Sequence, residues 1–221
     1  MPLLSTRLPI IALLALLLLA SSACALTRME TANQLEAEQT VMGGSIDNIG
    51  YGPIPRVQFY AMQGIADRGD ISGHVGTSLL TANAGLGGRF YPTERINLSL
   101  QGDISTVLMD LPMTDHAFGD PTLLTAVPRL STATKGDEFF YAGIQSNIVT
   151  ELHTDSPQLK GVLGGLILGL DFGSPDEGGG FQGELVLYPA QYQDGNWTFF
   201  ADLNEGEIIL FQISVGGYWS D

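Results

Sequence analysis

The strongest constraint on the fold is an alternation of apolar and polar residues that recurs along most of the chain. In DISGHVGTSL, residues 70–79, Ile71, Val75 and Leu79 occupy odd positions, and polar or small residues occupy the even ones. RINLSLQGDIS, residues 95–105, repeats this division. Successive side chains of a β-strand point to opposite faces, so a period of two gives each segment one apolar and one polar face. The pattern therefore predicts a series of half-buried strands.

Turn residues separate these segments, for example at Asp67-Arg68-Gly69 and Asp194-Gly195, and no helix-length pattern follows Gln39. We therefore predict an all-β fold, a closed antiparallel up-and-down meander barrel. The predicted strands are 38–49, 54–65, 70–80, 83–91, 95–106, 121–130, 138–150, 161–172, 181–190, 197–203 and 207–219. Bacterial outer-membrane barrels have even strand numbers. We therefore expect about ten strands, with the short 197–203 segment or its neighbour in excess.

The segment GVLGGLILGLDFG, residues 161–173, carries glycines at every fourth position. On a helix these glycines would form a packing ridge for a membrane dimer. Thirteen residues are too few to cross a bilayer as a helix, which needs ~20 apolar residues. On a strand the glycines share a face with Ile167 and Asp171, and the large apolar residues occupy the other face. We predict a strand.

Residues 1–23 have the features of an export signal. Arg7 supplies a positive charge, an apolar run follows from Leu8 to Ala20, and small residues precede Cys24, the only cysteine. The apolar run is shorter than a bilayer-spanning helix. We therefore predict a cleaved signal peptide rather than a permanent membrane anchor.

The stretch from Ser21 to Cys24 resembles the lipobox of bacterial lipoproteins, in which the cysteine becomes an acylated N-terminus. Ser21 departs from the leucine usual at that position, and ordinary cleavage at Ala23-Cys24-Ala25 is the competing interpretation. A lone unmodified thiol would be an odd residue to keep in an oxidising compartment. The resemblance implies that Cys24 is lipidated and, because Ala25 rather than aspartate follows it, that the protein is sorted to the outer membrane.

Three regions follow from these observations: a lipoprotein signal peptide (1–23), a lipid-anchored polar tether (24–39) and a β-barrel domain (40–221). The tether is expected to be exposed or to form a short helix, with Thr27 and Glu30 as a capping box. From Cys24 onward the chain has eight basic and 24 acidic residues, a net charge of −16. This charge disfavours nucleic acid as a partner. The partner that the sequence indicates is membrane lipid, through acylated Cys24 and the barrel exterior.

The polar strand faces carry groups suited to a wet interior. The lumen candidates are Asp70, His74, Arg89, Asp103, Gln145, Asn147, Asp171 and Gln212. Arg89 and Asp103 are expected to lie close enough to interact, because an unpaired charge inside a narrow barrel is costly. The outward candidates are Val57, Phe59, Ile71, Val75, Leu98, Leu100, Leu166, Leu168, Ile213 and Val215.

Alternation alone does not decide which face is inside. A soluble lipocalin-like barrel would turn its apolar face inward around a ligand. The terminal strand, with Tyr218-Trp219 near its end, resembles terminal strands of outer-membrane barrels. Together with TRMETANQLEAEQTVMGG, residues 64–105 and FGDPTLLTAVPRL, it is similar to small, poorly characterised β-barrel outer-membrane lipoproteins of Gram-negative bacteria. That resemblance implies no agreed activity and no catalytic residues.

The sequence offers little support for chemistry. His74 lies within a predicted strand, whereas His116 and His153 lie in predicted loops, and nothing ties a nucleophile to a base. We predict no enzyme, although a lipid-modifying barrel enzyme stays a third alternative. Asp176-Glu177 and the acidic group Asp202, Glu205 and Glu207 lack the spacing of a calcium loop. We therefore predict no metal and no cofactor. A structural, interaction or small-solute permeation role fits the sequence best.

Overall fold

The computed structural model describes residues 30–49, 55–78, 81–108, 122–132, 140–152, 157–193, 195–199 and 210–220. The strands are β1 (Thr40–Ile49), β2 (Arg56–Ala66), β3 (Gly69–Thr77), β4 (Thr81–Thr93), β5 (Ile96–Val107), β6 (Thr122–Thr132), β7 (Phe140–Leu152), β8 (Pro157–Ser174), β9 (Gly179–Gln193), β10 (Asn196–Phe199) and β11 (Leu210–Ser220). One 3-10 turn, η1 (Pro175–Glu177), joins β8 to β9. The predicted all-β class is confirmed.

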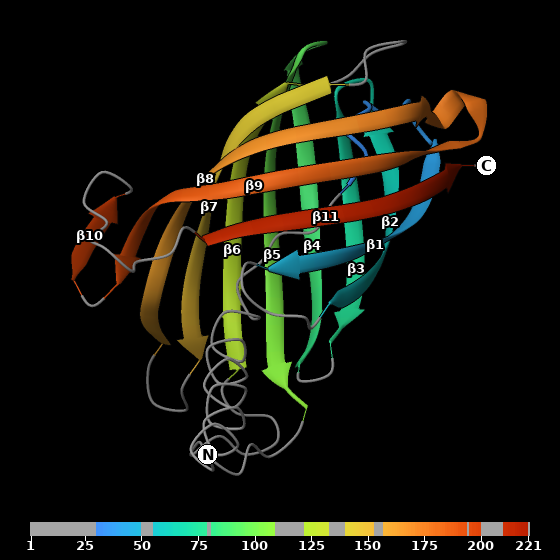
Figure 1. Cartoon of the computed structure of the whole chain (residues 1–221). Coiled ribbons are helices and arrows are strands. Elements are labelled where there is room, and N and C mark those ends of the chain that lie inside the picture. The colour runs from blue at the N-terminus through green and yellow to red at the C-terminus, as the bar shows by residue number, and fades with distance from the viewer. Residues whose placement is uncertain are drawn as a thin grey trace, which may run out of the picture.

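Ten strands close into an antiparallel barrel (Figure 1). Each strand from β1 to β9 pairs with the next in sequence, β9 also pairs with β11, and β11 pairs with β1. The predicted meander of about ten strands is therefore confirmed. The excess segment forms the four-residue β10. Among the described strands it pairs only with the end of β9, and it is not part of the closed barrel wall.

The two ends of the barrel differ. At one end, β1 begins, β11 ends, and tight connections join β2 to β3, β4 to β5 and β8 to β9. We call this the turn end. At the opposite end, which we call the loop end, β1, β3, β5, β7 and β9 finish and the connection from β9 to β11 includes β10.

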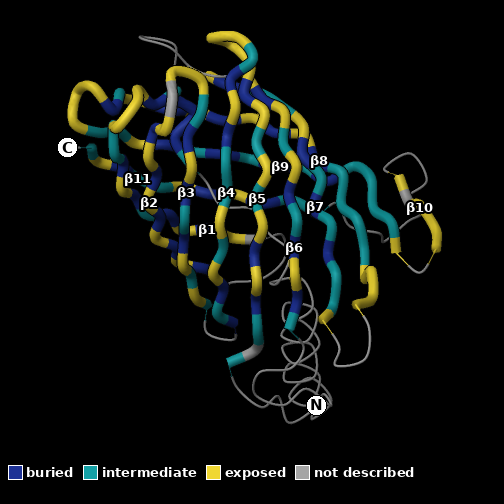
Figure 2. Tube along the Cα trace, turned by 180° about the vertical axis from the view of Figure 1, so that it is seen from behind, coloured by how far each residue is buried: buried dark blue, intermediate teal, exposed yellow. Residues whose placement is uncertain are grey.

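The apolar faces point outward and the polar faces point inward. On β5, Leu98 is 42% exposed and Leu100 is 61% exposed, whereas Asp103 is 5% exposed. All ten outward candidates are exposed, and the same alternation runs along the other strands (Figure 2). This is the reverse of a lipocalin-like arrangement, which would place Leu98 and Leu100 inside.

The glycine-rich segment belongs to β8, as predicted. Its glycines make room for large side chains of the neighbouring strand. A Cβ atom on Gly169 would lie 2.1 Å from Cζ of Tyr141, the residue that pairs with Gly169 across β7 and β8. Tyr141 lies flat over this glycine and is fully buried. None of the helical segments among the described residues has the length and apolar character that a membrane-crossing helix needs.

If the outward face contacts lipid, a charge in the middle of that face should be costly. We predict that Leu100→Arg lowers the free energy of unfolding by about 2–4 kcal/mol, because mid-bilayer arginine is poorly solvated. The matched control is Ile96→Arg on the same face of β5 but at the turn end, which should cost about 0–1 kcal/mol. Urea unfolding of protein refolded in lipid vesicles measures both. Equal costs would contradict a lipid-facing band.

Candidate functional site

The barrel interior holds the candidate site. The structure places all eight lumen candidates among the buried side chains: Asp70 and His74 on β3, Arg89 on β4, Asp103 on β5, Gln145 and Asn147 on β7, Asp171 on β8 and Gln212 on β11. They do not form one cluster. Instead they take part in separate polar networks at different levels of the lumen.

In the half of the lumen nearer the turn end, which we call the turn half, the central ion pair is Arg89 and Asp70, which are register partners on β4 and β3. Arg89 Nε donates to Asp70 Oδ1 at 2.7 Å and Arg89 Nη2 donates to Asp70 Oδ2 at 2.8 Å. The hydroxyl of Tyr91 donates to the same carboxylate at 3.1 Å. This two-pronged geometry is among the strong forms of ion pairing, and it neutralises both buried charges.

The predicted contact between Arg89 and Asp103 is wrong. Arg89 pairs across the sheet with Ser99, whereas Asp103 pairs with Gly85, four positions before Arg89 in β4. Four residues of strand correspond to roughly 13 Å. Asp103 instead contacts Nε2 of His74 and accepts a hydrogen bond from Gln101 at 3.2 Å.

Residues 30–35 enter the lumen, which differs from the exposed tether or short helix expected for this region. Asp171 accepts four hydrogen bonds there: from Thr31 Oγ1 at 2.8 Å, the backbone N–H of Ala32 at 2.6 Å, Asn33 Nδ2 at 3.4 Å and the Tyr218 hydroxyl at 2.9 Å. Thr31, Ala32 and Leu35 are all buried. Residues 30–35 of the predicted tether are therefore an inserted segment, and we use that name for them, whereas Glu36, Ala37 and Glu38 are exposed as expected.

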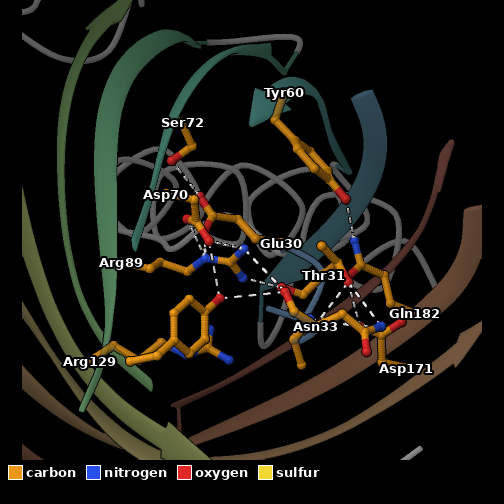
Figure 3. A network of polar contacts seen from close by, with 12 residues as sticks. Glu30, Thr31, Asn33, Tyr60, Asp70, Ser72, Arg89, Arg129, Asp171 and Gln182 are labelled. Carbon is orange, nitrogen blue, oxygen red and sulfur yellow. Dashed lines mark hydrogen bonds and ion pairs between the residues drawn. The ribbon is translucent and has the colours of Figure 1, made fainter. Parts of the chain in front are cut away.

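The inserted segment is also bound from the opposite wall. Arg89 donates from Nη1 to the carbonyl of Thr31 and from Nη2 to the carbonyl of Asn33 at 3.3 Å. Ser72 donates to the Glu30 carboxylate at 2.9 Å. Figure 3 shows Thr31 and Asn33 between Arg89 on one side and Asp171 on the other. The segment thus connects β3 and β4 to β8 across the barrel.

Two apolar contacts hold the segment as well. Ala32 packs in a buried cluster with Tyr141, Ile167, Val186 and Tyr188, and Leu35 packs in another with Val41, Tyr60, Met62 and Tyr218. The adjoining backbone passes very close to β2, because a Cβ on Gly64 would overlap the carbonyl oxygen of Glu36. Because Gly64 has no side chain, the chain can leave the lumen in close contact with β2 at this point.

Two further networks include residues that the sequence reasoning missed. Arg129 on β6 reaches Glu184 on β9 at 2.5 Å, and the Tyr141 hydroxyl donates to the same carboxylate at 2.9 Å. The Tyr188 hydroxyl accepts from Gln145 at 3.1 Å and donates to Gln212 at 3.3 Å. Glu184 and Gln182 are two positions apart and both buried on the inward face of β9. The same period of two could therefore have identified Glu184 as a lumen residue from the sequence.

Several predicted positions lie outside the described residues: Cys24, Thr27, His116, His153, and the acidic group Asp202, Glu205 and Glu207. Asp176 and Glu177 form the first turn of η1, where Asp176 accepts a hydrogen bond from Gln39 at 2.9 Å. Within the described ranges, no group of three or more His, Cys, Asp or Glu side chains has a geometry that would hold a metal ion.

No protein-family model and no curated protein matches this chain. Among solved structures, it is similar to the N-terminal β-barrel domain of Pseudomonas aeruginosa OprF, with 11% identity, coverage of 85% of this chain and 100% of that chain, and a TM-score of 0.31. The chain is also similar to Ail, the attachment invasion locus protein of Yersinia pestis, with 9% identity, coverage of 85% of this chain and 100% of that chain, and a TM-score of 0.28. A third similar structure is the outer membrane protein OprG of Pseudomonas aeruginosa, with 9% identity, coverage of 87% of this chain and 99% of that chain, and a TM-score of 0.28. With TM-scores this low, no activity or residue role passes from these proteins to this chain.

Asp171 should be the main attachment point of the inserted segment. Asp171→Ala removes the acceptor of four hydrogen bonds, and each buried donor left without a partner costs about 1–3 kcal/mol. We predict a fall of about 3 kcal/mol in the free energy of unfolding and faster hydrogen exchange at the amide of Ala32. Asp67→Asn at the exposed β2–β3 turn is the control and should change neither quantity. Unchanged exchange at Ala32 in Asp171→Ala would contradict this attachment.

A double-mutant cycle separates the observed ion pair from the one expected from the sequence. We predict a coupling energy of about 2 kcal/mol between Arg89→Met and Asp70→Asn, because the two side chains are in contact. Arg89→Met and Asp103→Asn should be additive within about 0.5 kcal/mol. Equilibrium unfolding of the single and double variants gives both values. Strong coupling of Arg89 to Asp103 would show that the register of β3, β4 and β5 is wrong.

Proposed function

We propose that this protein is a lipid-anchored β-barrel of the bacterial outer membrane with a structural or interaction role. The outward-facing apolar side chains carry the proposal. Large apolar residues are exposed on every strand of the barrel, including Phe59 on β2, Leu86 on β4 and Ile144 on β7. In water such a surface would be a liability, but in a bilayer it is the surface that lipid requires.

Closure supports the same conclusion. A spanning sheet must have no open edge within the hydrocarbon, because lipid offers no hydrogen bonds to unpaired backbone groups. Pairing of β1 with β11 leaves the ten-stranded wall without an edge. Short periplasmic turns and longer external loops are typical of bacterial barrels. By that rule the turn end faces the periplasm and the loop end faces the cell exterior.

The contents of the lumen favour a structural or interaction role over open permeation. Buried side chains occupy the interior, and the inserted segment crosses the turn half between Arg89 and Asp171. An open pore would present these charged groups to water. The lipocalin-like alternative is disfavoured, because the large apolar side chains that would line its ligand cavity face outward.

The lipid anchor rests on Cys24, which follows the export signal and precedes the inserted segment. A single acyl chain gives only marginal membrane binding. A closed barrel with an apolar exterior would hold the protein in the membrane without it. We therefore expect the anchor and the barrel to be separable in experiment.

The test compares the wild-type chain with Cys24→Ser. We predict that the intact mass of the wild-type mature protein includes acyl groups on Cys24, and that Cys24→Ser abolishes labelling by a fatty-acid analogue. Both forms, refolded, should require detergent or lipid and should migrate differently before and after heating. A wild-type mass that corresponds to a mature protein beginning at Leu26 would contradict the lipid anchor. Solubility of Cys24→Ser in plain buffer would contradict the membrane barrel.

A further inference from the structure

The hairpin formed by β9 and β10 leaves the barrel wall at the loop end. In the described part of the chain, β11 begins at Leu210, opposite Tyr188 of β9. β10 takes the same side of β9 from Ala190 onward, while β8 stays paired on the other side as far as Tyr192. Figure 1 shows β10 beside the end of β9, away from β1 to β5. The hairpin therefore continues the sheet past the closed wall.

The two faces of this hairpin differ in chemistry. Tyr192 and Trp197 are cross-strand partners, so their side chains share a face. Their ring centroids are 5.3 Å apart, and the ring of Phe199 stacks on Trp197 at 6.0 Å. The other face carries Gln193, whose cross-strand partner is Asn196. The hairpin is therefore amphipathic, although it lies outside the closed wall that separates an exterior from a lumen.

The aromatic face is continuous with the outward face of the barrel. Val162 on β8 is the register partner of Tyr192. Val162 lies four positions before Leu166, which points outward and is 48% exposed, and β8 pairs regularly with β7 between them. Because side chains an even number of positions apart share a face, Val162 also points outward. The row from Val162 through Tyr192 to Trp197 therefore extends the proposed lipid-facing surface.

The position of this row matches one boundary of a bilayer. Phe172, at the turn end of β8, is ten residue steps from Val162, which corresponds to roughly 33 Å of strand. A strand tilt of ~35–45° reduces this to roughly 23–27 Å along the barrel axis, and the apolar band of bacterial barrels is ~25 Å tall. Just beyond Val162, the Lys160 ammonium pairs with Glu151. Trp197 therefore lies where the apolar band gives way to charged groups.

We infer that the aromatic face of the β9–β10 hairpin, formed by Tyr192, Trp197 and Phe199, binds the headgroup region of the membrane leaflet at the loop end. This inference rests on the proposed function, because it requires the barrel to lie in a bilayer. Tryptophan and tyrosine favour that region, since the ring body contacts acyl chains while the N–H or O–H group reaches water and headgroups. Gln193, on the opposite face, then points to water. The hairpin is a surface attachment additional to the barrel itself.

Tryptophan fluorescence of protein refolded in lipid vesicles tests this attachment. The chain has two tryptophans, so Trp219→Phe leaves Trp197 as the sole reporter. We expect its emission to shift to the blue and to lose most of its intensity in phosphatidylcholine that is brominated near the carbonyl end of its acyl chains. Bromine atoms near the methyl end should quench it less, and dissolved iodide should quench it little.

Two control variants use the same measurement. Gln193→Trp with Trp197→Phe and Trp219→Phe moves the sole tryptophan to the polar face of the same hairpin. Its emission should be shifted to the red, and it should be quenched by iodide much more than by brominated lipid. Trp197→Phe leaves Trp219, which is exposed on β11 at the turn end. Brominated lipid should quench Trp219, because this residue reports whether the barrel itself lies in the bilayer.

The outcomes separate this inference from the proposed function. If brominated lipid quenches Trp219 but iodide quenches Trp197, the hairpin attachment is overturned and the membrane barrel stands. Blue-shifted emission of Trp197 that neither quencher reaches would show that protein, such as a second copy of the chain, covers the face, and would also overturn it. Equal lipid quenching at positions 193 and 197 would contradict the assigned orientation. If brominated lipid does not quench Trp219 in protein with heat-modifiable migration, the proposed function itself fails.

Discussion

The pairing of β1 with β11 is the interaction on which the rest of the structure depends. It joins the first and last strands of the barrel and leaves no edge in the ten-stranded wall. In lipid an open edge would expose backbone groups that no solvent molecule could satisfy. Closure also separates the two faces of every strand into an exterior and a lumen. A strand period of two then places one face of every strand in a confined interior, and in this structure that is the polar face.

That confinement explains the chemistry of the lumen. Charges that face one another inside a narrow barrel are stable only when each is paired and hydrogen-bonded. Arg89 therefore binds Asp70, Arg129 binds Glu184 and Arg56 binds Asp47. Among the described residues, Asp171 binds no arginine and is satisfied instead by Thr31, Ala32, Asn33 and Tyr218. The inserted segment is thus part of the hydrogen-bonding of the barrel interior rather than a linker beside it.

The fold was largely predictable because its main signal is local. Alternation separates Leu98 and Leu100 from Asp103 on opposite faces of β5, but only the burial of Asp103 shows which of the two faces is inside. The pairing inside the lumen was not predictable in the same way. Whether Arg89 meets Asp70 or Asp103 depends on the register between strands, which the connection from β3 to β4 determines and alternation does not. A shift of four residues along the strand changes the partner without changing the face.

The inserted segment was missed for a different reason. TRMETANQLEAEQ is polar, and polar sequence is equally suited to a hydrated linker and to a polar lumen. Composition therefore could not distinguish the two environments of Thr31 and Asn33. The decisive partner, Asp171, lies about 140 positions away in sequence. Only the closed barrel brings it beside the segment.

The central claim is that apolar side chains face lipid and polar side chains face a closed lumen. Spin labels placed one at a time at positions 97–104 of β5, in the Cys24→Ser background in lipid vesicles, test it most directly. The account predicts that labels at Leu98, Leu100 and Ile104 are accessible to oxygen dissolved in the bilayer, whereas labels at Asn97 and Asp103 are shielded from it. The opposite alternation, with Asn97 and Asp103 outside and the leucines enclosed, would contradict the account.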